Sequence, residues 1–203
     1  MAKARSGSRG VPRAERERQI CDAAAAEFAT LGYAGTTIAQ VAARAGVSKP
    51  LVLSYFSSKE GLYVACCERA GRAMTQGVAE ALAVSDATAI GRGAEVLSAI
   101  FTALEPRPHD WLVLFDSTLP AQGPAVDTAT HYRLRLGEQA AEGIAASFAP
   151  HLSEPGDLSA LTQVWIAMVS ALVEWWLRHP DQTAEQMTRR SDRLLTALAT
   201  ASK

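Results

Sequence analysis

Apolar positions along the chain recur three or four residues apart, and the strict alternation typical of β-strands is rare. This helical spacing begins after Arg13, and Gly32 follows it as a stop signal. The positions that keep the spacing are Ile20, Ala23, Ala24, Phe28 and Leu31. The pattern therefore predicts a first helix over residues 13–31.

The stretch TTIAQVAARAG predicts a very short second helix. Thr37 forms a capping box with Gln40, three residues later. In this motif each side chain accepts a hydrogen bond from the backbone amide of the other residue. The apolar positions that follow are Ile38, Val41, Ala42 and Ala45. Gly46 ends this helix after barely two turns.

A third helix is predicted to begin at Ser48, which can accept a hydrogen bond from the opening amides. Pro50 is tolerated there because its missing N–H falls in the first turn. Ser57 with Glu60 reads as a second capping box, which starts the next helix at about Ser58. The third helix is therefore about two turns long.

The remainder of the chain predicts a long helix and five further helices. The long one runs from Ser58 to about residue 84, and segments rich in proline and glycine separate the others. Their expected ranges are 87–104, 109–118, 124–148, 158–178 and 183–201. We find no internal repeat. The predicted fold class is all-α, and 203 residues with 48% apolar side chains are enough to bury a real core.

The two short helices, joined by Gly46 and braced by the first helix, predict a helix-turn-helix, whose second element enters the DNA major groove. Val47, Val52 and Phe56 are suited to hold that element. The opposite side presents Pro50, Leu51, Leu53 and Ser54, with Lys49 and Tyr55 at the edges. The alternative is a small packed bundle in which the two leucines belong to a core.

The net charge of −1 is unevenly distributed along the chain. Residues 1–60 carry nine Lys/Arg against five Asp/Glu, and residues 61–203 carry eleven against sixteen. Six of the nine cations precede Ile20, as a basic arm that reaches phosphates requires. The alternative is a solubilising tail.

The start of the chain lacks the apolar stretch of a signal peptide, and three cysteines make no disulfide framework, so we expect a cytoplasmic protein. The most apolar run, Val164 to Leu177, is shorter than the roughly 20 residues of a membrane span, so we expect no membrane partner. The adjacent Cys66 and Cys67 are interpreted as ordinary buried thiols, because neighbouring helix positions point about 100° apart and chelate poorly; the alternative is a redox or metal switch.

Catalytic motifs are missing from the sequence. It has no Gly-rich phosphate loop, no G-x-S-x-G and no paired metal-ligand spacing, and its four histidines are scattered. We expect no enzymatic activity, no cofactor and no metal.

The segment TTIAQVAARAGVSKPLVLSYFSSKEGLY resembles the DNA-binding signature of the tetracycline-repressor (TetR) family of bacterial transcription regulators, and the resemblance covers about residues 13–63. It implies a homodimer whose amino-terminal unit binds a palindromic operator. It also implies a carboxy-terminal helical domain that dimerises and holds a small ligand that lowers DNA affinity. The expected organisation is a basic arm over 1–12, a DNA-binding domain over 13–60 and a ligand and dimer domain over 61–203.

By matched position, the resemblance implies phosphate contacts at Thr37 and Lys59, and a groove-facing set around the third helix. The full predicted DNA set is Arg13, Thr37, Ser48, Lys49, Pro50, Leu51, Leu53, Ser54, Tyr55 and Lys59. Leu53 departs from the family, which usually has an aromatic hydroxyl there. Since leucines pack on thymine methyls and Lys49 can donate to guanine, we expect half-sites that pair a guanine contact with nearby thymine.

The helix predicted over 158–178 is apolar nearly all round, so something must cover both of its sides. One side can pack on the domain core and the other on a partner chain, with the last helix completing a four-helix bundle. The predicted interface residues are Leu161, Leu172, Trp176, Met187, Leu194 and Leu198. The alternative is a monomer that buries this helix centrally.

The ligand site is predicted from aromatic and apolar side chains on helices that surround a cavity in the family. The candidates are Phe101, Trp111, Phe115, Tyr132, Trp165 and Met168. An apolar or amphipathic effector would release a repressor from DNA. The alternatives are an activator, a regulator without a ligand, or a helical binding protein with a vestigial DNA unit.

Overall fold

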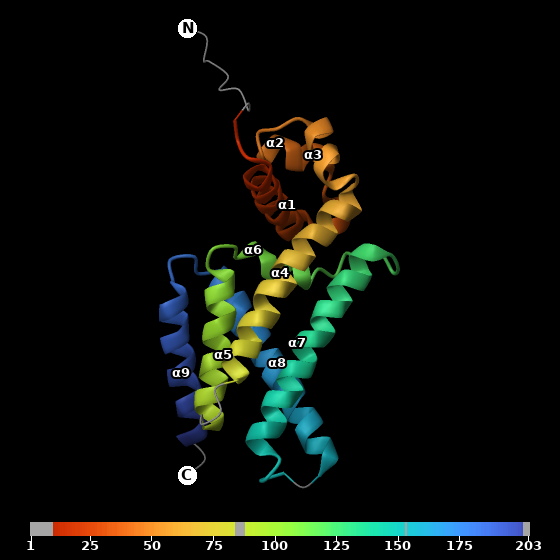
Figure 1. Ribbon diagram of the computed structural model, residues 1–203. Helices are drawn as coiled ribbons and strands as arrows, with labels where there is room; N and C mark the ends of the chain where they lie inside the picture. Colours follow the sequence, from red (N-terminus) through yellow and green to blue (C-terminus); the bar gives the residue numbers. More distant parts are fainter. Residues whose placement is uncertain (1–9, 84–87, 153, 201–203) are drawn as a thin grey trace.

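The computed structural model describes residues 10–83, 88–152 and 154–200, and this part of the chain is helical with no strand. The all-α prediction is confirmed (Figure 1). The helices are α1 Arg13–Gly35, α2 Ile38–Arg44, α3 Lys49–Phe56, α4 Lys59–Leu82, α5 Ala89–Leu104, α6 His109–Leu114, α7 Pro124–Phe148, α8 Pro155–Leu177 and α9 Ala184–Thr200. Most of the predicted basic arm lies outside the described residues.

Local capping signals account for the starts of several helices. Thr37 and Gln40 form the predicted capping box of α2, and Ser48 accepts a hydrogen bond from the Leu51 amide at the start of α3. The second predicted capping box is wrong. Ser58, rather than Ser57, caps α4, because Ser57 closes α3 with a positive φ of 64°.

The first helix is longer than predicted. Gly32 breaks its regular geometry with a φ of 68°, as its position suggested, but the chain continues in helical form to Gly35. The break brings the end of α1 against the loop after α6, where Thr118 leaves no room for a Cβ on Gly32. Only glycine fits that approach with this backbone conformation.

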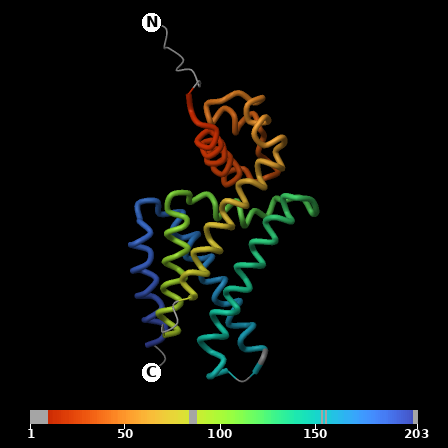
Figure 2. The backbone as a smooth tube through the Cα atoms, viewed as in Figure 1, coloured from red at the N-terminus to blue at the C-terminus, as the bar shows by residue number. Residues whose placement is uncertain are grey.

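The helices α1 to α3 form a compact unit at one end of the molecule (Figure 1). The long α4 leaves that unit and runs into a bundle with α5, α7, α8 and α9, as the trace in Figure 2 shows. The short α6 lies between the two parts and contacts both α1 and α4. The short α6 thus links the bundle to the amino-terminal unit through direct contacts.

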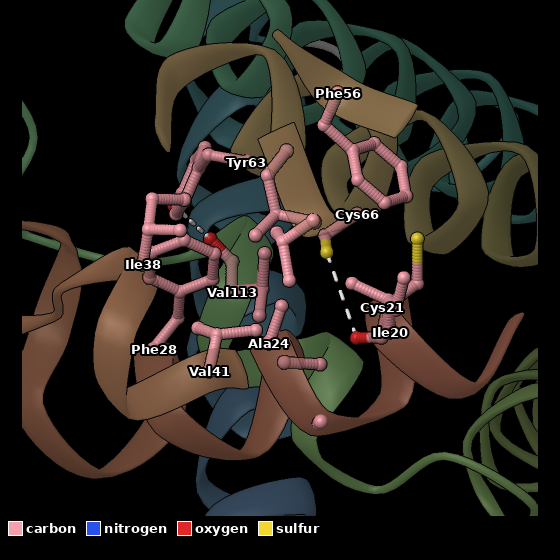
Figure 3. Close-up of a cluster of buried hydrophobic side chains, with 14 of the residues drawn as sticks. Ile20, Cys21, Ala24, Phe28, Ile38, Val41, Phe56, Tyr63, Cys66 and Val113 are labelled. Atoms are coloured by element: carbon pink, nitrogen blue, oxygen red, sulfur yellow. Dashed lines mark hydrogen bonds between the residues drawn. The ribbon is translucent and has the colours of Figure 1, made fainter. Parts of the chain in front are cut away.

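Two clusters of buried apolar side chains hold these parts. The first fills the amino-terminal unit around Phe28, Val41 and Tyr63, and it extends to Val113 of α6 (Figure 3). The hydroxyl of Tyr63 donates to the Val113 carbonyl. The second cluster fills the bundle. Because the first core includes α6, the amino-terminal unit is packed firmly on the rest of the chain.

The helix α8 has an apolar surface that the chain itself leaves largely open. Its segment Gly156–Leu177 is long and apolar enough to cross a membrane, with a mean hydropathy of 1.4, although only the shorter Val164–Leu177 run stood out in the sequence. In the described chain 11% of the most apolar window is buried. Val169, Val173 and Trp176 nevertheless pack into the second core, as in a helix of a folded bundle.

Candidate functional site

The turn before α3 is fixed by backbone geometry at Gly46. This residue has a φ of 65°, its N–H donates to the Ala43 carbonyl, and the Val47 N–H donates to the Ala42 carbonyl. The two bonds satisfy carbonyls at the end of α2 and reverse the chain sharply. They set the direction in which α3 leaves.

One flank of α3 is buried and the opposite flank faces solvent. Val52 is fully buried and Phe56 is 8% exposed, so these two side chains anchor the helix on α1 and α2. Lys49, Pro50 and Ser54 are exposed. A two-turn helix would be unstable alone, and the buried pair supplies the support that it needs.

The remaining predicted DNA residues surround this exposed flank. Ser48 is exposed and Leu51 is half-buried. Tyr55 is half-buried, and the guanidinium carbon of Arg13 lies 4.7 Å from its ring centroid. Leu53 packs partly against the first core, which reduces the surface that it offers to a groove.

Lys59 is engaged within the chain rather than directed to solvent. Its ammonium donates to the carbonyls of Tyr33 at 2.9 Å and Thr36 at 3.1 Å, and it lies 4.3 Å from the Tyr33 ring centroid. It closes the end of α1. The phosphate contact predicted for Lys59 is therefore not supported by this geometry, because two of its three N–H donors are already used.

The hydroxyl of Thr37 is also used locally. It accepts from the Gln40 amide at 3.3 Å and donates to the Gln40 side-chain oxygen at 2.7 Å, while the residue itself is exposed. Because Thr37 is exposed, the start of α2 can still contact a phosphate. The capping box holds the backbone there in place.

The family of bacterial regulatory proteins named tetR matches residues 20–66, which span α2, α3 and most of the supporting core. Residues 20–66 thus resemble the amino-terminal segment of the TetR family. The TetR match ends within α4, so it covers the amino-terminal unit and the first turns of the connecting helix.

A curated relative is similar to part of this chain. The transcriptional activator FasR of Mycolicibacterium smegmatis is 42% identical over 78 residues, which are 38% of this chain and 35% of the relative. The chain therefore matches about a third of the length of that relative. The relative is a transcription regulator rather than an enzyme, in agreement with the expectation from the sequence.

Solved structures share the fold over most of the chain. Bacillus subtilis FadR in complex with stearoyl-CoA has a TM-score of 0.64 and 19% identity, over 88% of this chain and 96% of that one. AibR in complex with isovaleryl coenzyme A and operator DNA has a TM-score of 0.69 and 17% identity, over 89% and 97%. At these identities the likeness establishes the fold.

A cavity of about 630 Å³ lies inside the bundle, between α4, α5, α7, α8 and α9. Four of the six predicted ligand residues line it: Trp111, Phe115, Trp165 and Met168. The volume is typical of small-molecule sites, and the lining is mostly apolar.

Two predicted ligand residues do not line the cavity. Phe101 is fully buried and packs edge-on against Trp176, with ring centroids 5.3 Å apart. Tyr132 lies directly over Gly71 of α4, where a Cβ would overlap its ring. Phe101 belongs to the second core and Tyr132 packs against it, because neighbouring helices approach both residues more closely than the sequence could show.

Polar residues of the cavity were not identified from the sequence. Arg92, Arg133 and Gln139 line it together with the apolar side chains. Gln139 donates to the Thr75 carbonyl at 2.9 Å, while its own oxygen has no hydrogen-bond partner among the described residues. No motif marks these positions, because they come together only through the packing of α4, α5 and α7.

The predicted dimer residues fall into two groups. Leu194 and Leu198 are 46% and 65% exposed, and Leu161 and Leu172 are half-buried. Trp176 and Met187 are only 5% and 0% exposed. The prediction is wrong for this last pair, because the chain's own core covers them and leaves no surface for a partner.

The cysteines are buried thiols. Cys66 donates to the Cys21 carbonyl at 3.7 Å, and burial raises the pKa of Cys67 to about 12. In the part of the chain that the structure describes, no group of three or more metal-ligating side chains comes together. Neither feature favours the redox or metal switch considered for Cys66 and Cys67.

Proposed function

We propose that this chain is a sequence-specific DNA-binding transcription regulator. The observation that carries the proposal is the exposed flank of α3 with Pro50 and Ser54, set against the buried anchors Val52 and Phe56. Such a helix can enter a major groove without losing its support. We assign DNA binding to residues 13–60, preceded by a basic arm over 1–12, and effector binding and dimerisation to residues 61–203.

Base reading is assigned to the exposed side of α3. Lys49 can donate to guanine, and Leu51 can pack on a thymine methyl. Arg13 lies beside Tyr55 at the edge of the same surface. Phosphate contacts from Arg13, the arm and the start of α2 supply the sequence-independent part of the affinity.

A homodimer on a palindromic operator follows from the open face of α8 and α9. Val164, Leu194 and Leu198 are the most exposed large apolar side chains of these two helices. A second copy would bury them, and it would place a second α3 about 34 Å away, one turn of DNA along the duplex. Val164 was not among the predicted interface residues, because it lies outside the apolar stripe of α8 from which they were chosen.

A small apolar or amphipathic effector is assigned to the cavity. TetR-fold neighbours of this chain bind acyl coenzyme A compounds, and the cavity has the apolar lining that an acyl chain needs. To change a mostly DNA-bound population into a mostly free one, the effector must favour one conformation by about 5 kcal/mol.

The route between cavity and DNA unit runs through the loop after α6. Phe115 and Arg133 line the cavity, and Arg133 donates to the Leu114 and Asp116 carbonyls. The Asp116 carboxylate in turn accepts from the Tyr33 amide at the end of α1. A ligand that moves Phe115 therefore disturbs the contact that orients α1.

Repression, released by the effector, is the mode we propose, because a dimer across a palindrome occludes the promoter that contains it. The relative FasR is named an activator, so activation is the second candidate. Transcription from a promoter that carries the selected operator, with and without the protein, separates the two. Both modes place the protein in the cytoplasm with the chromosome, without an enzymatic step.

The test of the proposal is DNA binding by fluorescence anisotropy at several salt concentrations. Wild-type protein should bind its operator with a steep salt dependence. Lys49→Ala should weaken operator binding by about 1–3 kcal/mol while the dimer stays intact. Equal binding of operator and unrelated DNA by the wild type would overturn the proposal.

A further inference from the structure

We infer that the cavity is a site for an unbranched aliphatic chain with a carboxylate head, held with the head at Arg92 and the tail directed at α6. This inference rests on the proposed effector function and specifies the ligand class and its direction. It combines three observations: the length of the cavity, the charge at one end, and the aromatic pair at the other.

The cavity is elongated along the bundle. Its lining on α5 extends from Ala89 to Ile100, which corresponds to about 17 Å at the rise of an α-helix. Its lining on α7 extends from Arg133 to Phe148, about 22 Å. A volume of about 630 Å³ holds roughly 20 non-hydrogen atoms, at the volume that a water molecule takes in the liquid. These dimensions suit a long, thin ligand.

The charged end is at Arg92, in the first turn of α5. Its guanidinium makes one long hydrogen bond, 3.4 Å to the Leu82 carbonyl, and its Nε is buried with no hydrogen-bond partner among the described residues. In residues 10–83, 88–152 and 154–200 no carboxylate lies within ion-pair distance of it. A partly buried cation in an apolar cavity is stabilised by an anion, and a carboxylate fits a guanidinium in two-point geometry.

Arg133, the other cation that lines the cavity, is not free to bind a carboxylate head in the same way. Its guanidinium donates to the carbonyls of Leu114 at 2.6 Å and Asp116 at 3.0 Å. Those bonds tie it to the end of α6. The head is therefore assigned to Arg92, which lines the cavity beside the end of α4 and donates to the Leu82 carbonyl.

The tail end is lined by Trp111 of α6 and by Phe115, which directly follows this helix, and their ring centroids lie 4.3 Å apart. An extended chain advances about 1.2 Å per bond, so about fourteen carbons match the roughly 17 Å over which α5 lines the cavity. Shorter chains fill the cavity without touching α6. The cavity thus distinguishes ligands by chain length, because only long chains reach α6 and disturb its contact with α1.

The binding experiment uses the full-length dimer and the fluorescence of Trp111 and Trp165. Octanoate, dodecanoate and hexadecanoate are titrated beside the alcohols of equal length. We expect affinity to rise about fourfold per methylene up to roughly fourteen carbons. We also expect each carboxylate to bind about tenfold tighter than its alcohol, as a charge-assisted hydrogen bond provides.

The variant Arg92→Gln should remove this tenfold preference while hexadecanol still binds, which also shows that the variant is folded. Arg72→Gln, an exposed position on α4 outside the cavity, is the matched control and should keep the preference. Equal binding of hexadecanoate and hexadecanol to the wild type, or a preference that Arg92→Gln leaves intact, would overturn the inference.

DNA release is measured separately, so that the two proposals fail independently. Hexadecanoate should lower operator affinity, and octanoate, at concentrations that saturate the cavity, should not. Release by both acids to the same extent would overturn the length-sensing part and keep the effector function. Tight, Arg92-dependent binding of hexadecanoate without any effect on DNA would overturn the effector function and keep the assigned site.

Discussion

The backbone amide of Tyr33 donates to the carboxylate of Asp116 at 2.6 Å. This hydrogen bond joins the last turn of α1 to the loop that follows α6. The same carboxylate accepts from the amide and hydroxyl of Thr118, at 2.7 and 2.8 Å. Asp116 therefore fixes the position of the DNA unit relative to the wall of the cavity.

Asp116→Ala should weaken the coupling between effector and DNA. The substitution leaves a buried amide unpaired, which costs about 1–3 kcal/mol of unfolding free energy. Ligand affinity should be little changed, and the ratio of operator affinities with and without ligand should shrink toward one. Chemical denaturation and paired anisotropy titrations measure both quantities. The exposed Glu142→Ala on α7 is the control, and an unchanged ratio in Asp116→Ala would contradict this route.

The ion pair between Arg69 of α4 and Asp110 of α6, at 2.7 Å, predicts a large stability effect. Burial raises the pKa of the Asp110 carboxyl, and the Arg69 guanidinium opposes that shift. Arg69→Ala leaves a carboxylate buried without its partner and should cost about 3 kcal/mol of unfolding free energy. Arg72→Ala, which breaks an exposed pair with Glu68 within α4, should cost less than about 1 kcal/mol. If urea denaturation gave equal losses of unfolding free energy for the two variants, the buried ion pair would contribute no more to stability than the exposed one.

The proposed dimer surface predicts a specific monomer-forming substitution. Ala171 is exposed on α8 and does not line the cavity, so Ala171→Arg would place a charge in the apolar interface. Sedimentation velocity should show a dimer for the wild type and a monomer for this variant, with operator binding strongly reduced. Ala145→Arg, on the exposed side of α7, should remain dimeric. A dimer in both variants would place the interface elsewhere.

The thiols should differ in reactivity. Cys66 and Cys67 are fully buried, and burial raises the pKa of Cys67 to about 12, so little thiolate forms at neutral pH. Cys21 is 6% exposed, and the neighbouring Cys66 thiol side chain lowers the pKa of the Cys21 thiol. Iodoacetamide should modify Cys21 first and leave the other two intact in the folded protein, as mass spectrometry would show. Rapid modification of Cys67 would reopen the redox interpretation.

Helix limits could be predicted closely because their signals are local. The capping box of Thr37 with Gln40 is complete within four residues, and Gly46 turns the chain by its own backbone freedom. The failure at Ser57 has the same origin. Two adjacent serines satisfy the same pattern, and only the packing of Phe56 decides which one caps α4.

Tertiary roles were less accessible, because a helical period identifies an apolar face but not what covers it. Trp165 lines the cavity and Trp176 lies in the core, although both belong to one stripe of α8. Met187 of α9 was placed at the interface for the same reason. Arg92 carried no sequence signal, because its partial burial depends on where α4 ends.

The most direct test of the central claim is selection of DNA by the wild-type protein from a pool of random duplexes, followed by sequencing. The account predicts an inverted repeat with half-site centres about 34 Å apart, lost from the selected pool when Lys49→Ala is used. A pool without any enriched sequence, or the same enrichment by wild type and Lys49→Ala, would contradict reading of DNA by α3.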